Sequence, residues 1–226
     1  MRMLTLAATP IGNHLDASAR LVQKLEEADV VLAEDTRVFA DLCRRLNLNL
    51  HAKVVSLHDH NESSRLESLL SILQAKMDVV LVSDAGLPLI NDPGYKLVQL
   101  AISNGIPMTC IPGPSAPLTA LVLSGLPVHR FTFEGFLPPK TASRLAALRK
   151  LQTEERTMIF LESKYRVTRC LEDMLEVFGE YRHGAICREL TKPHEEVVRA
   201  KLVELVEVAR KRELKGEICL AIEGAR

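Results

Sequence analysis

Two loops rich in glycine and proline each follow a short apolar run in this chain of 226 residues. The first loop, residues 83–88 (SDAGLP), follows the run 79–82, and the second, residues 112–116 (PGPSA), follows the run 108–111. Small residues let a ligand approach the backbone closely, and proline holds a loop in one shape. Ligands of open α/β sheets bind at the carboxyl ends of strands. The two loops therefore predict a ligand-binding cleft, although two tight connecting turns would have a similar composition.

Strand and helix patterns alternate along the whole chain. In the first half, strands are predicted at 4–8, 30–33, 54–57, 79–82 and 108–111, and helices at 21–28, 66–73 and 95–103. In the second half, strands are predicted at 131–136, 157–161, 185–188 and 216–222, and helices at 115–123, 143–151, 167–177 and 195–210. The first half has the βαβ rhythm of a mostly parallel sheet with crossover helices. We predict an α/β fold with an N-terminal α/β domain over 1–113 and a C-terminal α/β domain over 114–226.

Composition excludes several classes of protein. The 29 basic and 29 acidic side chains give no net charge, but the most basic stretch lies in the second half, at 140–169. A solvated helix face is the usual meaning of such a stretch, and an RNA-binding surface is a less common one. The five cysteines are scattered and form no CxxC pair, so neither a disulfide framework nor a zinc site is predicted. No apolar stretch has the length of a signal peptide or a membrane span, so we expect a cytoplasmic protein.

Common catalytic motifs are missing from the sequence. It has no GxxxxGK[ST] phosphate loop, no GxSxG elbow and no HExxH zinc motif. The first turn after a strand, residues 9–13, has one glycine where a dinucleotide-binding fold would have GxGxxG. His58 and His60 could bind a metal, but no second cluster of matching ligands accompanies them. A solvated polar loop explains this pair better, and no metal is predicted.

Nine short motifs follow one another in a recognisable order over nearly the whole chain. They are ATPIGN at 8–13, AEDTR at 33–37, SLHDHNE at 56–62, the loops at 83–88 and 112–116, SGLP at 124–127, GFLP at 135–138, RELTK at 188–192 and KGE at 215–217. Together they closely resemble the ribosomal RNA small-subunit methyltransferase I family, which belongs to the tetrapyrrole-methylase-like superfamily. The resemblance implies two α/β domains with S-adenosylmethionine in the cleft between them, usually in a homodimer. The implied activity is 2′-O-methylation of a cytidine in 16S rRNA of the small ribosomal subunit.

The resemblance also implies a set of cofactor-binding residues. In the first domain and the segment that follows it, they are Pro10, Asp84, Ala85, Gly86, Leu87, Pro112, Gly113, Ser115 and Ala116. Glu162 and Leu190, at the ends of second-domain strands, would close the pocket from the other side. For Pro10, Pro112 and Leu190, a role in shaping the loops is an equally good explanation.

Methyl transfer to a ribose hydroxyl requires removal of its proton, so a general base or a water relay is expected. The first candidates for the base are Asp35, Glu189 and His58, and Asp84 and Glu162 are further titratable groups at strand ends. Asp35 could instead form a structural ion pair with the nearby Arg37. Phosphate contacts would supply salt-dependent affinity for RNA. The residues expected to contact RNA are Arg37, Asn61, Lys140, Arg144, Lys164 and Arg166.

The chain departs from the family pattern at three places. Leu87 stands where members typically have threonine, SKYR at 163–166 replaces an SPHR-like segment, and many members continue beyond the position of Arg226. Two other functions stay open at this point. A methyltransferase of small, tetrapyrrole-like molecules is favoured by the neutral charge and opposed by the AEDTR and HNE segments. The other is a non-catalytic RNA-binding protein with the same fold.

Overall fold

The computed structural model describes residues 3–75 and 77–225, with the side chains of Asp59 and His60 outside the description. The possible metal ligand His60 therefore lies outside the described side chains. Internal contacts divide the chain into two compact units, unit 1 up to Ser115 and unit 2 from Ala116. This division falls two residues after the predicted boundary at 113. Each unit is described by itself below.

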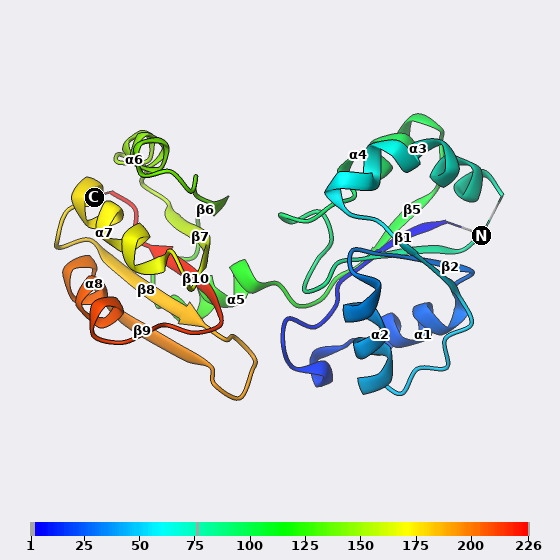
Figure 1. The fold of residues 1–226 in the computed structure, drawn as a ribbon, viewed down its shortest axis with the longest axis horizontal. Helices are drawn as coiled ribbons and strands as arrows, with labels where there is room; N and C mark the ends of the chain where they lie inside the picture. The colour runs from blue at the N-terminus through cyan, green and yellow to red at the C-terminus, as the bar shows by residue number, and fades with distance from the viewer. Residues whose placement is uncertain (1–2, 76, 226) are drawn as a thin grey trace. The chain divides into compact units, whose positions relative to one another are not determined.

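Unit 1 is a five-stranded parallel sheet in the order β3-β2-β4-β1-β5 (Figure 1). Its strands are β1 (Leu4–Ala7), β2 (Val30–Ala33), β3 (Lys53–Ser56), β4 (Val79–Val82) and β5 (Met108–Ile111). Its helices are η1 (His14–Asp16, a single 3₁₀ turn), α1 (Ala19–Glu27), α2 (Thr36–Arg45), α3 (Asp59–Gln74) and α4 (Tyr95–Ser103). The β2 and β4 strands are buried throughout, which explains their continuous apolar sequences.

The connections of β1 and β4 run in opposite directions across the sheet. The chain passes from β1 over β4 to β2, and later from β4 over β1 to β5. Since crossovers are right-handed, the two directions place helices on opposite faces. Leu21, Leu25 and Phe39 of α1 and α2 pack on one face, and α3 and α4 cover the other (Figure 1). A reversal of this kind marks the position at the sheet edge where α/β proteins bind ligands.

Unit 2 has a mixed sheet in the order β6-β7-β10-β8-β9, in which β6 and β7 are parallel and the other pairs antiparallel. Its strands are β6 (Phe131–Phe136), β7 (Thr157–Ser163), β8 (His183–Arg188), β9 (Glu196–Lys201) and β10 (Glu217–Ile222). Its helices are α5 (Ala116–Ser124), α6 (Thr141–Lys150), α7 (Val167–Phe178) and α8 (Leu202–Lys211).

The two faces of this second sheet are covered differently. Helices α6, α7 and α8 share one apolar core with Ile186 and other side chains of the sheet. The neighbouring side chain, Cys187, points to the other face, because side chains alternate along a strand. There its thiol donates a hydrogen bond of 3.8 Å to the Ala120 carbonyl of α5. Helix α5 therefore covers the face opposite the other three helices.

The predicted fold class is confirmed, with three differences in the elements. Helix α3 begins at Asp59, before the predicted start at 66, so the segment that was predicted as a polar loop forms the first turn of this helix. The segment 195–210 was predicted as one helix, but its first part is the edge strand β9, because Val197 and Val198 extend alongside β8. Helix α2 was not predicted. It begins after Asp35, whose side chain accepts a hydrogen bond from the Arg37 N–H and caps the helix. Among the described helices, none combines the length and the apolar character needed to cross a bilayer.

Candidate functional site

The loops that follow β1 and β4 are bonded to each other at the sheet edge of unit 1. The Thr9 N–H donates to the Gly86 carbonyl at 2.9 Å, and the Gly86 N–H donates to the Thr9 carbonyl at 3.1 Å. The buried Thr9 hydroxyl also donates to the Ser83 carbonyl at 3.2 Å. Gly86 has a φ of +88°, a conformation that side chains disfavour. This backbone conformation therefore favours glycine at position 86, and the two backbone hydrogen bonds between Thr9 and Gly86 make the loop rigid.

Acidic side chains connect the loop after β4 with the loop after β2. The Asp84 carboxylate accepts a hydrogen bond of 3.0 Å from the Asp35 N–H, and the Asp84 N–H donates to the Glu34 carboxylate at 3.5 Å. Three carboxylates therefore lie at the carboxyl edge of neighbouring strands. Asp84 and Glu34 each hold the backbone of the other loop, whereas Asp35 caps its own helix, α2.

Asp35 and Arg37 form a close, exposed ion pair. The Arg37 guanidinium donates two hydrogen bonds to the Asp35 carboxylate, at 3.0 and 2.6 Å, while the Arg37 N–H donates a third at 2.8 Å. These bonds with Arg37 hold the pKa of Asp35 well below its usual range. A carboxylate with a lowered pKa is a weak base. The geometry therefore favours the structural role for Asp35 over the role of general base.

The pKa of Asp84 moves in the other direction. Partial withdrawal of its carboxylate from water raises the pKa, and the neighbouring charge of Asp35 adds to the effect, against the hydrogen bond from the Asp35 N–H. A carboxylate that holds a proton more strongly is a better general base. Of these two aspartates, Asp84 is the better candidate.

The loop after β5 lies on the same edge of unit 1. Pro112 and Gly113 are exposed, and a Cβ at 113 would lie 3.0 Å from the Cβ of Ala8, the residue after β1. Gly113 thus lets this loop pack against the neighbouring strand. Ser115 ends unit 1, and Ala116 begins both unit 2 and α5. On the two other loops, Pro10 is buried, Ala85 is exposed and Leu87 is half-buried.

The HNE segment builds the start of α3. The Asn61 side chain accepts the His58 N–H at 2.9 Å and donates to the Ser56 carbonyl at 3.3 Å. The buried Glu62 carboxylate accepts the Leu97 N–H of α4 at 3.1 Å. The amide of Asn61, predicted as an RNA contact, is therefore used within the fold. His58 lies half-buried at the first residue before the helix.

In unit 2, Glu162 is an interior residue at the end of β7. Its carboxylate accepts the Ser163 N–H at 2.7 Å and the Arg166 guanidinium at 2.8 and 2.7 Å. The Glu162 side chain has no exposed surface. It therefore shapes the loop 163–166, and Arg166, predicted as an RNA contact, neutralises it.

Glu189 and Gly216 fit together at the opposing ends of β8 and β10. The Glu189 carboxylate accepts the Glu217 N–H at 2.9 Å and the Lys192 ammonium at 3.1 Å. Burial raises the pKa of Glu189, but these two donors outweigh that effect, so the pKa is lowered. Glu189 and Thr191 have φ values of +50° and +64°, an unusual conformation for residues with side chains. The two hydrogen bonds to the Glu189 carboxylate hold this loop, and Leu190, between Glu189 and Thr191, is buried.

Replacing Gly216 by alanine is expected to destabilise unit 2 by about 2 kcal/mol. Gly216 has a φ of +90°, and a Cβ there would overlap the Glu189 carboxylate. Urea unfolding of G216A, E189A and the double variant measures the coupling. We expect G216A to lower the free energy of unfolding less in the E189A variant, which lacks the carboxylate, than in the wild type. An equal loss in the two proteins would contradict the overlap.

Arg144, predicted as an RNA contact, is buried inside unit 2. It is 2% exposed, its Nε donates to the Asp173 carboxylate at 2.6 Å, and Nη1 donates to the Pro139 carbonyl at 3.0 Å. The prediction is corrected here, because a buried guanidinium with internal partners does not reach a phosphate. Lys140, the exposed residue before α6, stays a candidate, as does the half-buried Lys164.

The structure gathers part of the predicted site at one edge of each sheet. In unit 1, Asp35, Asp84 and Gly86 are linked through hydrogen bonds among their loops. In unit 2, Glu162 lies near the end of β7 and Glu189 directly follows β8, and these strands run in the same direction, since both are antiparallel to β10. Three contributing residues were missed, namely Thr9, Glu34 and Gly216. Thr9, Glu34 and Gly216 lie in the ATPIGN, AEDTR and KGE motifs, respectively, and membership of these motifs was the sequence signal that could have identified them.

The sequence matches known proteins over most of its length. Residues 3–206 match the family of tetrapyrrole (corrin/porphyrin) methylases. Proteins named ribosomal RNA small subunit methyltransferase I are 50% identical in Mycobacterium tuberculosis and 44% identical in Escherichia coli O157:H7. The alignments cover 98% of this chain and, respectively, 78% and 77% of those relatives.

Solved structures share the fold at low sequence identity. The methyltransferase CobJ has a TM-score of 0.74 at 19% identity, over 100% of this chain and 95% of that one. Uroporphyrin-III C-methyl transferase from Thermus thermophilus, in complex with S-adenyl homocysteine, has a TM-score of 0.67 at 21% identity, over 99% and 97% of the two chains. The chain therefore belongs to the tetrapyrrole methylase family and, within it, to the ribosomal RNA small subunit methyltransferase I family.

Proposed function

We propose that this protein transfers a methyl group from S-adenosylmethionine to the 2′-oxygen of a cytidine in 16S rRNA. The observation that carries the proposal is the 50% identity over 98% of the chain to proteins named for small-subunit rRNA methylation. The tetrapyrrole alternative is supported by the neutral charge and by fold neighbours at about 20% identity, such as CobJ at 19%. The non-catalytic alternative has no feature of the described residues in its favour.

The loops of unit 1 fit the cofactor that the family uses. The cofactor is S-adenosylmethionine, which supplies a methyl carbon on a positively charged sulfur when bound. Ala85 and Gly113 offer exposed backbone with little or no side chain, and the rigid Gly86 keeps it in place. The carboxylates of Glu34 and Asp84 complement a positive charge at the same edge. We assign the binding to Asp84, Ala85, Gly86, Leu87, Pro112, Gly113, Ser115 and Ala116, with Pro10 as a further contact.

The remaining chemistry needs a group that takes the proton of the ribose hydroxyl. Asp84 is our candidate, because its pKa is raised by partial burial, whereas bonds to Arg37 lower the pKa of Asp35. Glu189 also has a lowered pKa, and its carboxylate already holds the loop 189–192. We therefore place Asp35 and Glu189 in positioning roles. His58 stays a second candidate for the base.

The partner in this proposal is 16S rRNA within the small ribosomal subunit. Lys140 and Lys164 are the proposed phosphate contacts, and Arg37 offers an exposed guanidinium that is shared with Asp35. A ribosomal substrate places the reaction in the cytoplasm. We also propose that the protein acts as a homodimer, as expected from the family resemblance.

The substrate class is tested by transfer of a labelled methyl group to alternative acceptors. Purified small ribosomal subunits that lack the modification, protein-free 16S rRNA and a tetrapyrrole precursor are each incubated with the protein and labelled S-adenosylmethionine. We expect label on the ribosomal substrates only. Label on the tetrapyrrole alone would reject the rRNA assignment, and calorimetry that detects no cofactor binding would reject both enzymatic functions.

A further inference from the structure

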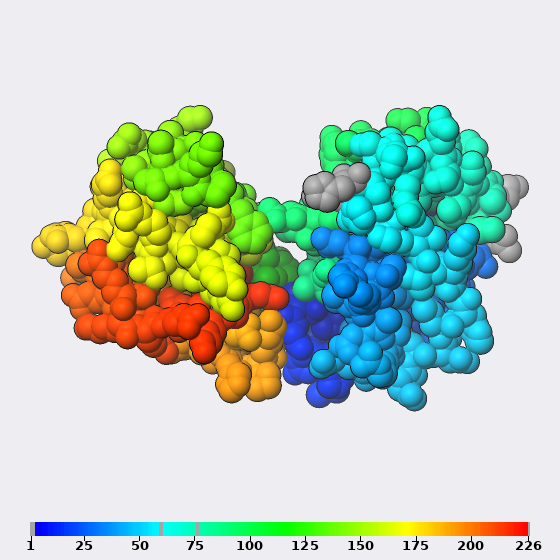
Figure 2. All heavy atoms as spheres, in the orientation of Figure 1, coloured from blue at the N-terminus to red at the C-terminus, as the bar shows by residue number. Residues whose placement is uncertain are grey.

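A pocket lies in unit 2, at the edge of its sheet away from Glu162 and Glu189. It is lined by Phe178–His183, Lys201, Glu223 and Gly224, and its volume is about 390 Å³. We call it the β8 pocket, since it surrounds the first residue of β8. The strand β8 has six residues and places its two ends roughly 17 Å apart. The turn between α7 and β8 projects from the surface as a yellow-gold knob in Figure 2.

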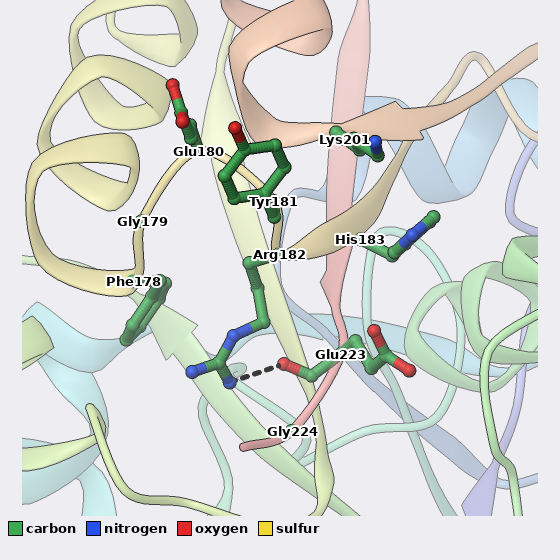
Figure 3. Close-up of a pocket in the computed structure, with 9 residues that line it drawn as sticks. All are labelled: Phe178, Gly179, Glu180, Tyr181, Arg182, His183, Lys201, Glu223 and Gly224. Carbon is green, nitrogen blue, oxygen red and sulfur yellow. Dashed lines mark hydrogen bonds between the residues drawn. The ribbon is translucent and has the colours of Figure 1, made fainter. Parts of the chain in front are cut away.

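The β8 pocket combines exposed aromatic and cationic groups. Tyr181 is 70% exposed, and the Lys201 ammonium lies 5.2 Å from the centroid of its ring. Figure 3 shows these two side chains on the same side of the pocket, with Glu180 beside the Tyr181 hydroxyl. A hydrogen bond with Glu180 raises the pKa of Tyr181 and orients the ring. Among the described residues, no carboxylate lies within ion-pair distance of Lys201.

The floor of the β8 pocket is held by hydrogen bonds between the segment of Arg182 and three others. Arg182 donates to the Glu223 carbonyl at 3.1 Å and to the Gln152 carbonyl at 3.4 Å, and its guanidinium lies 5.5 Å from the centroid of the Phe178 ring. The Arg182 carbonyl accepts the Leu202 N–H at 2.9 Å. The positive charge of Arg182 is thereby fixed, as Figure 3 shows for its bond to Glu223. A ligand would meet a site that is already formed.

These groups match the chemistry of a nucleotide. An exposed aromatic ring stacks on any base, and a nearby lysine attracts the backbone phosphate. The volume is that of a small-ligand pocket, and His183 adds a ring nitrogen at its exposed rim. An acidic peptide would use the lysine but would leave the tyrosine face unused. The carboxylates of Glu180 and Glu223 at the rim also disfavour a ligand held by charge alone.

We propose that the β8 pocket binds one nucleotide of single-stranded RNA, with the base on Tyr181 and the phosphate at Lys201. The proposal rests on the proposed function, because it takes the rRNA substrate as the source of this strand. It gives unit 2 a second RNA contact, at the sheet edge opposite Glu162 and Glu189. Such a contact adds affinity and orientation without taking part in methyl transfer.

Binding of a short fluorescein-labelled single-stranded RNA, followed by anisotropy, tests the proposal. Tyr181→Ala is expected to weaken binding roughly 5- to 100-fold through loss of stacking. Lys201→Gln should reduce the slope of log affinity against log salt by about 0.7, and Lys201→Arg should restore it. The matched controls are Tyr95→Ala, at a tyrosine that is 65% exposed on α4, and Lys211→Gln, at the exposed end of α8. Both controls should bind as the wild type does.

Intrinsic fluorescence reports on stacking at the same residue. The chain has three tyrosines and no tryptophan, so Tyr95→Phe with Tyr165→Phe leaves Tyr181 as the single emitter. Stacking of a base should quench it as RNA is added. Absence of quenching, or equal RNA affinity of Tyr181→Ala and wild type, overturns the proposal.

The assays also separate this proposal from the proposed function. Wild-type protein that methylates small subunits while both pocket variants bind RNA normally leaves the function standing and rejects the β8 pocket. Wild-type protein that binds the RNA through Tyr181 but methylates no ribosomal substrate rejects the function alone. Cofactor binding by calorimetry should be the same in all pocket variants, which excludes misfolding as the cause of weaker RNA binding.

Discussion

Asp84→Asn is expected to lower the single-turnover rate of methyl transfer by about 10²- to 10⁴-fold. The change keeps the size of the side chain and an oxygen that can accept the Asp35 N–H, but it removes the group that takes the proton. Asp35→Asn should have a much smaller effect, because asparagine is also a good helix cap and the pKa of Asp35 is already low. Rates are measured by rapid quench at saturating cofactor, so that weaker cofactor binding does not imitate a lost base.

Asp41→Asn is the matched control for this experiment. Asp41 lies on α2 in the same unit and pairs with Arg44 and Arg45, away from the loops after β2 and β4. It should react at the wild-type rate. A wild-type rate for Asp84→Asn would exclude Asp84 as the base and would leave His58 as the next candidate.

Arg144→Ala is expected to destabilise the protein by about 3–5 kcal/mol. The change leaves the Asp173 carboxylate, whose side chain is 6% exposed, as an unpaired charge inside unit 2. Urea unfolding gives the free energy, and an apolar pair such as R144M/D173L should recover much of the loss. The result would also show why this arginine is needed although it does not reach the surface.

Arg149→Ala provides a control on the same two helices. Arg149 of α6 pairs with Glu176 of α7 at 3.5 Å, and both side chains are largely exposed. Exposed pairs contribute about 1 kcal/mol or less. A loss for Arg144→Ala no larger than that for Arg149→Ala would contradict the account of a buried pair.

The local patterns of the sequence were sufficient for most of the fold. Apolar runs predicted β2, β4 and β5 at their observed bounds. The β2 and β4 strands are buried throughout, and the edge strand β5, with Thr109 and Cys110 exposed, is bounded by Pro107 and Pro112. The segment 195–210 was misread because β9 passes directly into α8 without a breaking residue. Helix α2 was missed although its sequence carries the capping Asp35, the apolar Phe39 and Cys43 at helical spacing, and arginines in the last turn.

The site was only partly predictable, because its decisive contacts join residues far apart in the chain. The motifs indicated Asp84 and Glu189. They did not indicate that the Asp35 N–H donates a hydrogen bond to Asp84, or that Gly216 leaves space for the Glu189 carboxylate. The basic stretch 140–169 suggested one RNA-binding surface. Charge alone does not distinguish an exposed lysine such as Lys140 from the interior Arg144, whose partner Asp173 is 29 residues away.

The position of the new methyl group tests the central proposal most directly. A ribose 2′-hydroxyl is the nucleophile of alkaline RNA cleavage, so a methyl group on this oxygen protects the adjacent phosphodiester bond. Small ribosomal subunits methylated with labelled S-adenosylmethionine are digested in alkali, and the products are separated. We predict that the label appears in an alkali-resistant dinucleotide that yields 2′-O-methylcytidine on enzymatic digestion. Label in an ordinary mononucleotide, with the methyl group on the base, would contradict the proposed reaction.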